Sequence, residues 1–447
     1  MMDENKRSEK FISQIAERVR AVVFVPVYNG QGSKEILGER SIASRVKEAV
    51  GLACAIKLNV VHHEIINITT PRPLTFFGAG KVDTFADYIS KHRIALAIVD
   101  HCLTPVQQHN LEKSWNCKVI DRTVLILEIF GDRARTKEGV LQVELAHLSY
   151  QKSRLVRSWT HLERQRGGRG FLGGPGETQI EADRRLLQDK ITRIRRELDT
   201  IVKTRSLHRA KRKKTPHPVV ALVGYTNAGK STLFNYLSGA NVLTKNMLFA
   251  TLDPTLRKII LPHGQTILLS DTVGFISDLP THLIAAFRAT LEEVVEADLI
   301  LHVRDMSDPD HRAHSQDVLE ILSSLGVDIG DTDRILEVWN KIDILDKHTL
   351  SVLRTSAKTS LNPVLMASAL TGEGLKQLLM AVEARISGET QSFELILKPN
   401  EMWLIDWFYK NSGKIEQESH YDGSITIKAV LTNEARKRLE YIKCKIN

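Results

Sequence analysis

The sequence predicts a multidomain α/β protein with four parts: a small parallel α/β N-terminal domain, an antiparallel helical hairpin, a doubly wound α/β domain and a small α+β C-terminal domain. The chain has 447 residues, too many for one ordinary hydrophobic core. Apolar strand-like runs alternate with helical segments in two stretches, as in parallel sheets with crossover helices. Between these stretches only helical periodicity is present. We expect the domains at 1–132, 133–214, 215–388 and 389–447.

Short apolar runs in the first domain predict strands, and the segments between them have helical periodicity. None of the runs is long enough to cross a bilayer, and the first residues lead into no apolar core of a secretory signal. We expect a cytoplasmic, monomeric protein, and the sequence does not indicate membrane association but leaves it open. The predicted strands are 21–28, 60–68, 94–100 and 118–120, and the predicted helices are 41–57, 82–91 and 105–115.

The second domain is predicted to be two helices joined by a glycine-rich stretch at 167–176, the second helix starting near Glu177. Apolar residues on the second helix follow a heptad pattern, which is typical of packing against another helix. On the first helix, four leucines share one face. The heptad residues are Ile180, Leu187, Ile191, Ile194, Leu198 and Ile201, and the leucines are Leu141, Leu145, Leu148 and Leu155.

Positive charge is concentrated on the second hairpin helix. The formal net charge of the chain is +9, and residues 184–214 contain thirteen lysines or arginines against three acidic residues. Clustering of one sign indicates a surface for a polyanion, whereas the simpler alternative is a solvated helix face. We favour nucleic acid as the partner.

Four cysteines, Cys54, Cys102, Cys117 and Cys444, form no CxxC pair. Their spacing supports neither a zinc site nor a disulfide framework. We expect buried, reduced thiols.

Residues 224–231 fit the pattern G-x-x-x-x-G-K-[ST], after the predicted strand 219–223 and before a helix that starts near Gly229. This context is typical of a phosphate-binding loop, whose backbone N–H groups and helix N-terminus face the phosphates. Lys230 would contact the β- and γ-phosphates, and the Ser231 hydroxyl would bind Mg²⁺. The loop consists of Gly224, Tyr225, Thr226, Asn227, Ala228, Gly229, Lys230 and Ser231.

A D-x-x-G motif follows the predicted strand 267–270. Asp271 would hold Mg²⁺ through water, and the Gly274 N–H would sense the γ-phosphate. Placed about forty residues after Lys230 and at a strand end, the motif supports a nucleotide switch. It consists of Asp271, Thr272, Val273 and Gly274.

An N-K-x-D motif follows the predicted strand 334–339. The Asp343 carboxylate would accept hydrogen bonds from guanine N1–H and N2–H, and adenine offers no such pair. Such bonds discriminate by roughly 10⁴ or more. Residues after the predicted strand 363–367 match the loop that supports the base. The two motifs are Asn340, Lys341, Ile342, Asp343 and Ser368, Ala369, Leu370.

The segment 249–255 (FATLDPT) occupies the position of a first switch loop, in which a threonine binds Mg²⁺ and the γ-phosphate only with GTP. Thr251 and Thr255 both fit that role. The four motifs in this order predict a doubly wound P-loop GTPase domain.

Two residues raise the question of how water is activated. Phe275 follows Gly274, where many small GTPases place a catalytic glutamine, so intrinsic hydrolysis should be slow or helped by a partner. Asn227 is the residue type found in GTPases that use a monovalent cation in place of an arginine finger. We hypothesise K⁺ stimulation, and the alternative is that Asn227 only caps the loop. Equal rates in K⁺ and Na⁺ would reject the hypothesis.

With these residues in place, the chain resembles HflX-type GTPases over roughly 25–385. The specific segments lie upstream of the nucleotide motifs, and the forms GYTNAGKST and FATLDPT are similar to the family as well. The glycine-rich stretch GGRGFLGGPG departs from a usually more compact form. The upstream segments are 121–123, 133–136, 138–139, 141–146, 158–163 and 174–179.

This resemblance implies a GTPase that binds the large ribosomal subunit (50S) and ribosomal RNA and dissociates or rescues stalled 70S ribosomes, with hydrolysis stimulated by the ribosome. It also favours Thr251 over Thr255, gives Lys230, Thr251 and Gly274 the catalytic roles and places Mg²⁺ on Ser231 and Thr251. A hydrophobic residue at Phe275 is itself a family feature. The implied GTP contacts also include Phe249, Ala250, Leu252 and Asp253.

Other functions remain open at this point. The chain could be a ribosome-assembly or RNA-remodelling GTPase, or a GTP-dependent regulator of a protein partner. The sequence at 78–81 (GAGK) resembles part of a phosphate loop, and a plain turn before a helix is the simpler interpretation. Within the tail we expect a small βαβ-like unit with strands at 393–397 and 424–430 and helices at 401–411 and 433–442.

Overall fold

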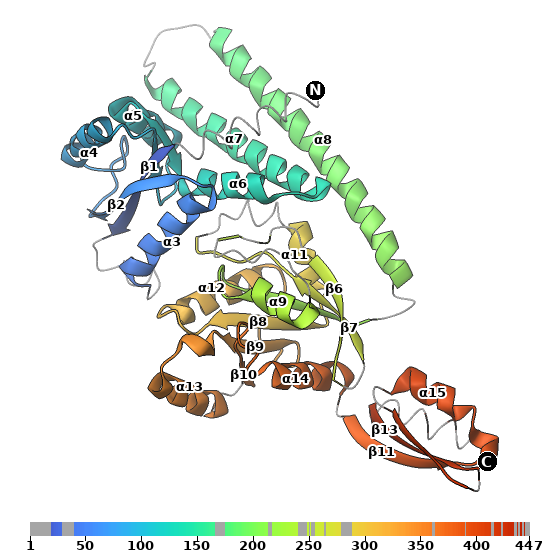
Figure 1. Cartoon of the computed structure of the whole chain (residues 1–447). Helices are drawn as coiled ribbons and strands as arrows, with labels where there is room; N and C mark the ends of the chain where they lie inside the picture. The colour runs from blue at the N-terminus through green and yellow to red at the C-terminus, as the bar shows by residue number, and fades with distance from the viewer. Residues whose placement is uncertain are drawn as a thin grey trace.

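The fold is that of a computed structural model (Figure 1). The structure describes residues 19–28, 40–165, 175–212, 217–239, 248–249, 251, 255–262, 265–278, 288–359, 363–388, 390–412, 415–421, 423–432, 436, 439 and 442.

The N-terminal domain is a four-stranded parallel sheet in the order β2-β1-β3-β4. The predicted parallel α/β fold is therefore confirmed. Its core is aromatic: Phe24 on β1 packs against Phe85 and Trp115 with ring centroids 4.4 and 5.2 Å apart. The elements are β1 Arg20–Tyr28, α3 Ile42–Ala55, β2 Asn59–Ile68, α4 Ala79–His92, β3 Leu96–Val99, α5 Pro105–Trp115, β4 Lys118–Asp121 and α6 Arg122–Arg133.

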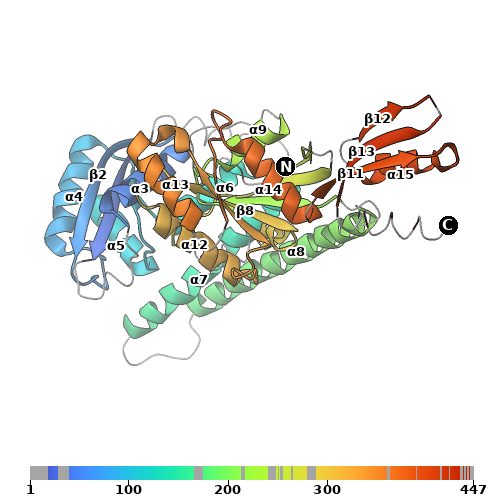
Figure 2. The same ribbon diagram turned by 90° about the horizontal axis from the view of Figure 1, so that it is seen from below.

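The hairpin consists of α7 (Lys137–Gln165) and α8 (Pro175–Arg212), which lie side by side in Figures 1 and 2. Leu148 of α7 and Ile191 and Ile194 of α8 form its buried core. Leu141, Leu145, Leu187 and Leu198 pack around them, as the heptad pattern predicts. Residues 167–174 of the glycine-rich stretch lie outside the described residues.

The third domain is a six-stranded sheet in the order β10-β9-β8-β5-β7-β6, parallel except for β6, which runs antiparallel to β7. The doubly wound prediction is confirmed, but β6 was not predicted. It is an edge strand in which only Ile259 is buried. Its sequence, TLRKII, therefore lacks a continuous apolar run that would predict a strand. The elements are β5 Val219–Gly224, α9 Lys230–Ser238, β6 Thr255–Ile260, β7 Thr266–Asp271, α11 Arg288–Val295, β8 Leu299–Asp305, α12 His311–Ser324, β9 Ile335–Asn340, η1 Ile342–Ile344, α13 Lys347–Thr359, β10 Val364–Met366 and α14 Leu375–Ser387.

The C-terminal domain is a three-stranded antiparallel sheet in the order β11-β13-β12 with α15 packed on it. The expected βαβ-like unit is wrong, because β11 and β13 run antiparallel. The intervening strand β12 has the polar sequence IEQES and gave no apolar signal. Figures 1 and 2 show this domain at the end of the molecule far from the N-terminal domain. Its elements are β11 Thr390–Leu397, η2 Pro399–Glu401, α15 Leu404–Asn411, β12 Ile415–Ser419 and β13 Ile425–Thr432.

Two further expectations concern cysteines and membranes. Among the described cysteines, Cys54 and Cys102 are exposed and Cys117 is half-buried, so the expected burial is wrong although all three are free thiols. Cys54 lies on the exposed face of α3, and Cys102 and Cys117 lie in loops. None of the described helices is long and apolar enough to span a membrane.

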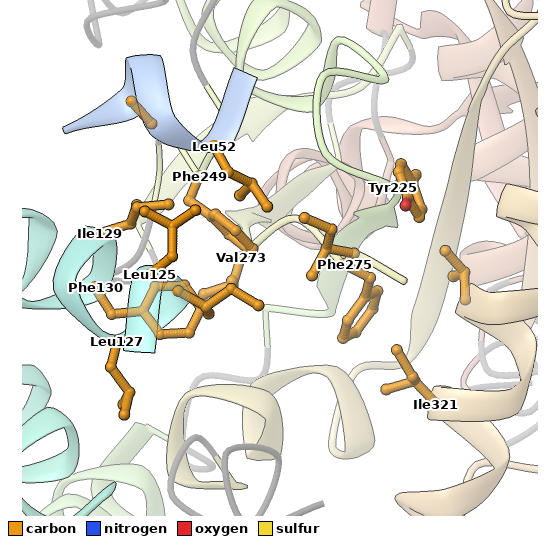
Figure 3. Packing of buried hydrophobic residues seen from close by; sticks show 14 of the residues in the cluster. Leu52, Leu125, Leu127, Ile129, Phe130, Tyr225, Phe249, Val273, Phe275 and Ile321 are labelled. Atoms are coloured by element: carbon orange, nitrogen blue, oxygen red, sulfur yellow. The ribbon is translucent and has the colours of Figure 1, made fainter. Parts of the chain in front are cut away.

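One hydrophobic cluster joins the N-terminal domain to the doubly wound domain (Figure 3). It includes Leu52 of α3 and Phe130 of α6 on one side, and Phe249, Val273 and Phe275 on the other. The two domains therefore share a core, and α3 and α6 lie directly beside the nucleotide motifs.

Candidate nucleotide site

The phosphate loop requires glycine at two positions because other groups approach its backbone closely. A Cβ on Gly224 would lie 2.2 Å from the carbonyl oxygen of Val303, and one on Gly229 would lie 2.3 Å from Nδ2 of Asn340. Gly229 also has a φ of +92°, in the region that favours glycine. The loop is thereby held between β8 and the N-K-x-D motif.

Lys230, the first residue of α9, is buried under the loop. Its Nζ donates hydrogen bonds to the carbonyl oxygens of Gly224, at 3.0 Å, and Tyr225, at 2.8 Å. Burial lowers the pKa of Lys230 to about 8, opposed by the nearby charge of Asp271. The ammonium group therefore lies inside the loop.

Three side-chain oxygens meet beside this lysine. Oγ of Ser231 lies 2.9 Å from Oγ1 of Thr251 and 2.7 Å from Oδ2 of Asp271, and Thr251 donates to the same Oδ2 at 2.9 Å. Oδ1 of Asp271 is buried and finds no hydrogen-bond donor among the described residues. Burial raises the pKa of Asp271, although the two hydroxyls and Lys230 oppose this. Hydroxyl and carboxylate oxygens are ligands that Mg²⁺ prefers, so this donor set fits the ion.

The D-x-x-G segment is joined to the phosphate loop by backbone hydrogen bonds. The N–H of Phe275 donates to the Gly224 carbonyl at 3.1 Å, and the N–H of Thr226 donates to the Phe275 carbonyl at 2.7 Å. A Cβ on Gly274 would lie 2.9 Å from Cγ2 of Thr226 and 3.1 Å from Nζ of Lys230. The Phe275 side chain is 3% exposed and packs into the shared core (Figure 3). Phe275 therefore cannot orient a water molecule.

The two base motifs contact each other and the phosphate loop. Asn340 donates from Nδ2 to the Ala228 carbonyl at 2.8 Å and accepts from the Ala369 N–H at 3.0 Å. The Ser368 hydroxyl donates to Oδ1 of Asp343 at 2.6 Å. Asp343 itself is exposed, as a residue that meets a ligand must be. The geometry suits recognition of a base edge.

A cavity of about 470 Å³ lies beside the loop. The motif residues Tyr225, Thr226, Asn227 and Lys341 line one side. Asp305, at the end of β8, also lines it and accepts from Nζ of Lys341 at 2.6 Å. Motif reasoning did not identify Asp305, but its position after a parallel strand next to β5 could have indicated it. Helix α3 forms the opposite wall through Ser44, Lys47, Glu48, Gly51 and Cys54, and no sequence signal pointed to this helix.

Two residues of the predicted base motifs do not join the others at the site. Leu370 is 75% exposed, whereas Ile342 is buried. Ala250, Leu252 and Asp253 lie outside the described residues. At 78–81, Lys81 lies 3.4 Å from Glu64 as an exposed ion pair, consistent with a plain turn before α4.

Sequence comparisons identify relatives over most of the chain. Family models match in order: GTP-binding GTPase N-terminal at 43–131, GTP-binding GTPase Middle Region at 133–212, 50S ribosome-binding GTPase at 219–341 and HflX C-terminal domain at 353–443. A GTPase HflX of Magnetococcus marinus is 48% identical over 369 residues, which is 83% of this chain and 84% of that protein. This chain belongs to the HflX family of GTPases.

Other HflX relatives are similar at the same level. The GTPase HflX of Escherichia coli is 46% identical over 358 residues, covering 80% of this chain and 82% of that protein. Among solved structures, a GTP-binding protein from Sulfolobus solfataricus in complex with GDP has a TM-score of 0.43 at 23% identity, covering 82% of this chain and 98% of that one. As an HflX-family member with these motifs, the chain is a P-loop GTPase that hydrolyses GTP.

Proposed function

We propose that this GTPase binds the large ribosomal subunit and its RNA and dissociates or rescues stalled 70S ribosomes, and that the ribosome stimulates hydrolysis. The observation that carries the proposal is the exposed basic surface of α8, a helix of 38 residues. A helix of that length projects about 57 Å at 1.5 Å per residue, far enough to reach into folded RNA. The match to the 50S ribosome-binding GTPase model at 219–341 supports the choice of partner. The exposed basic residues of α8 include Arg184, Arg185, Lys190, Arg193, Arg195 and Arg196.

The α8 surface gives a direct binding test. Replacing Arg195 and Arg196 with glutamine should weaken co-sedimentation with large subunits. Affinity falls as salt rises, and each lost phosphate contact should make the negative slope of log affinity against log salt shallower by roughly 0.7–0.9. A matched control replaces two exposed lysines of α13, Lys347 and Lys358, with glutamine. Equal binding and equal salt slopes for both variants would contradict an RNA-contacting role for α8.

We propose that GTP is bound by the loop 224–231, by 249–253, by 271–274 and by the base motifs 340–343 and 368–370. Ser231 and Thr251 would hold Mg²⁺ directly, and Asp271 would hold it through water. When bound, Mg²⁺ neutralises charge on the β- and γ-phosphates. Lys230 places its ammonium against the same oxygens, and the Gly274 N–H binds the γ-phosphate.

Water activation requires a group from outside this set, because Phe275 is buried and apolar. We propose that the ribosome supplies it and that K⁺ beside Asn227 adds positive charge. Asn227 is exposed with a left-handed φ of 62° and lines the cavity. Hydrolysis should then be several-fold faster in K⁺ than in Na⁺ at equal ionic strength, and Asn227→Ala should abolish that difference. Equal rates in the two salts would reject the K⁺ site and leave the GTPase assignment unaffected.

A further inference from the structure

The loop that follows β10 turns back on itself, and its own hydrogen bonds fix the turn. The Gly372 N–H donates to the Ser368 carbonyl, and the Ser368 N–H donates to the Glu373 carbonyl, each at 2.9 Å. The Thr371 N–H donates to the Ser368 hydroxyl at 3.1 Å, and this hydroxyl donates to Oδ1 of Asp343 at 2.6 Å. The conformation of this turn therefore decides where the Asp343 carboxylate is held.

Tyr236 of α9 packs against the backbone of the turn. A Cβ on Gly372 would lie 2.1 Å from Oη of Tyr236 and 2.7 Å from its Cζ, so only glycine leaves room for the ring. Gly372 also has a φ of +86°, in the region that favours glycine. Because Tyr236 is 53% exposed, burial of apolar surface is not its main contribution. The contact is a close fit between one ring and one turn.

The base loop is thereby connected to the phosphate loop at two places. Helix α9 begins directly after the phosphate loop, and Tyr236 extends from it to Gly372. The second connection is Asn340, which donates to the Ala228 carbonyl at 2.8 Å and accepts from the Ala369 N–H at 3.0 Å. A loop that is held at both places before the ligand arrives loses less conformational freedom when the base binds.

We propose that Tyr236 is a positioning residue for guanine recognition, holding the turn at Gly372 so that Ser368 directs the Asp343 carboxylate towards the base. Tyr236 belongs to none of the nucleotide motifs, and it contacts the loop and not the nucleotide. The inference rests on the proposed role of Asp343 as the acceptor for guanine N1–H and N2–H. Without the tyrosine ring the turn can shift, and both bonds from the base then lose their alignment.

The alternative is that Tyr236 only stabilises the fold. Hypoxanthine distinguishes the two roles, because it has the N1–H and O6 of guanine and lacks the N2 amino group. A loss of stability alone would weaken the binding of GDP and inosine diphosphate (IDP) alike, whereas a displaced Asp343 costs GDP the additional N2–H bond. The decisive measurement is therefore the ratio of GDP to IDP affinity, obtained by fluorescence competition with the full chain and no ribosomes.

Tyr236→Ala should lower the ratio of GDP to IDP affinity roughly five- to tenfold, about the value of one hydrogen bond. GDP should also dissociate faster by a similar factor. Tyr236→Phe keeps the ring and loses only the oxygen, so it should retain the ratio within threefold. The control is Tyr421→Ala, because Tyr421 is fully exposed on the C-terminal domain. This variant should stay within twofold of the wild type.

The glycine gives an independent test of the contact. Gly372→Ala should weaken GDP binding at least tenfold, because the added Cβ meets the Tyr236 ring. Gly326→Ala is the matched control: Gly326 has nearly the same φ, +88°, and nothing within 4 Å of an added Cβ. It should bind GDP within twofold of the wild type. In the double variant Tyr236→Ala/Gly372→Ala the clash is absent, so the loss should be smaller than the product of the two single losses.

Two results would overturn the proposal. One is an unchanged ratio of GDP to IDP affinity in Tyr236→Ala. The other is a double variant whose loss equals the product of the single losses, which would mean that Tyr236 and Gly372 act independently. Asp343→Asn separates this inference from the assignment on which it rests. If that variant loses the preference for GDP over IDP while Tyr236→Ala keeps it, only the positioning role fails. If Asp343→Asn keeps the preference too, the assignment of 340–343 to guanine fails as well.

Discussion

Replacing Asp343 with asparagine should weaken GTP binding by roughly 10³-fold, the combined effect of a lost charge-assisted bond and an unpaired donor. The Ser368 hydroxyl donates to Oδ1 of Asp343 at 2.6 Å and itself accepts from the Thr371 N–H at 3.1 Å. An asparagine here would keep its oxygen towards Ser368 and turn its NH₂ group towards the base. That NH₂ would face the N2–H₂ donor of guanine, donor against donor. Isothermal titration with a non-hydrolysable GTP analogue measures the loss.

The chemistry of the base provides a second readout. Xanthine has a carbonyl oxygen where guanine has its N2 amino group, so the Asp343→Asn site should bind xanthosine triphosphate better than GTP. The control is Asp333→Asn, the same chemical change at an exposed position before β9, which should leave GTP affinity within twofold. Unchanged GTP affinity in Asp343→Asn would contradict the assignment of 340–343 to guanine recognition.

Replacing Gly274 with alanine should lower GTP hydrolysis by about 10²-fold or more, the usual effect of misplacing one backbone donor. The added Cβ would lie 2.9 Å from Cγ2 and 3.0 Å from Cα of Thr226, so the loop and the D-x-x-G segment would have to separate. The Gly274 N–H would then move away from the γ-phosphate. GDP has no γ-phosphate, and its affinity should change less than threefold. Stopped-flow phosphate release and fluorescent GDP binding measure the two effects.

Gly131→Ala is the matched control for that change. Gly131 lies in α6, and nothing is within 4 Å of an added Cβ. Alanine also has the higher helix propensity, so this variant should fold and hydrolyse GTP like the wild type. Equal hydrolysis by Gly274→Ala and wild type would show that this glycine neither approaches Lys230 nor binds the γ-phosphate as proposed.

Much of the fold could be predicted because most of its strands are buried apolar runs. β5 and β8 lie in the centre of a parallel sheet, and both strands gave near-continuous apolar sequences. The strands that were missed, β6 and β12, are edge strands with mostly polar or half-exposed residues. Periodicity carries little signal in such strands, so only the sheet itself reveals them.

The nucleotide motifs could be located because each is a short local pattern after a strand. The contact of α3 with the nucleotide domain could not be predicted. Glu48 of α3 is hydrogen-bonded to Ser277, but the two residues are 229 positions apart and neither belongs to a motif. Nothing in the spacing of Phe130 indicates that it packs on Phe249. Contacts between domains depend on how two folded surfaces meet, and a single sequence contains no periodicity that encodes this.

The most direct test of the central claim is GTP turnover by the purified protein, alone and with large ribosomal subunits or whole ribosomes, with sedimentation of the ribosomes in parallel. The account predicts slow turnover alone, strong stimulation by ribosomes and loss of the 70S peak when GTP is present. Stimulation would identify the ribosome as the activator that the buried Phe275 requires. Unchanged turnover together with no co-sedimentation would contradict the ribosomal function, although the chain would remain a GTPase.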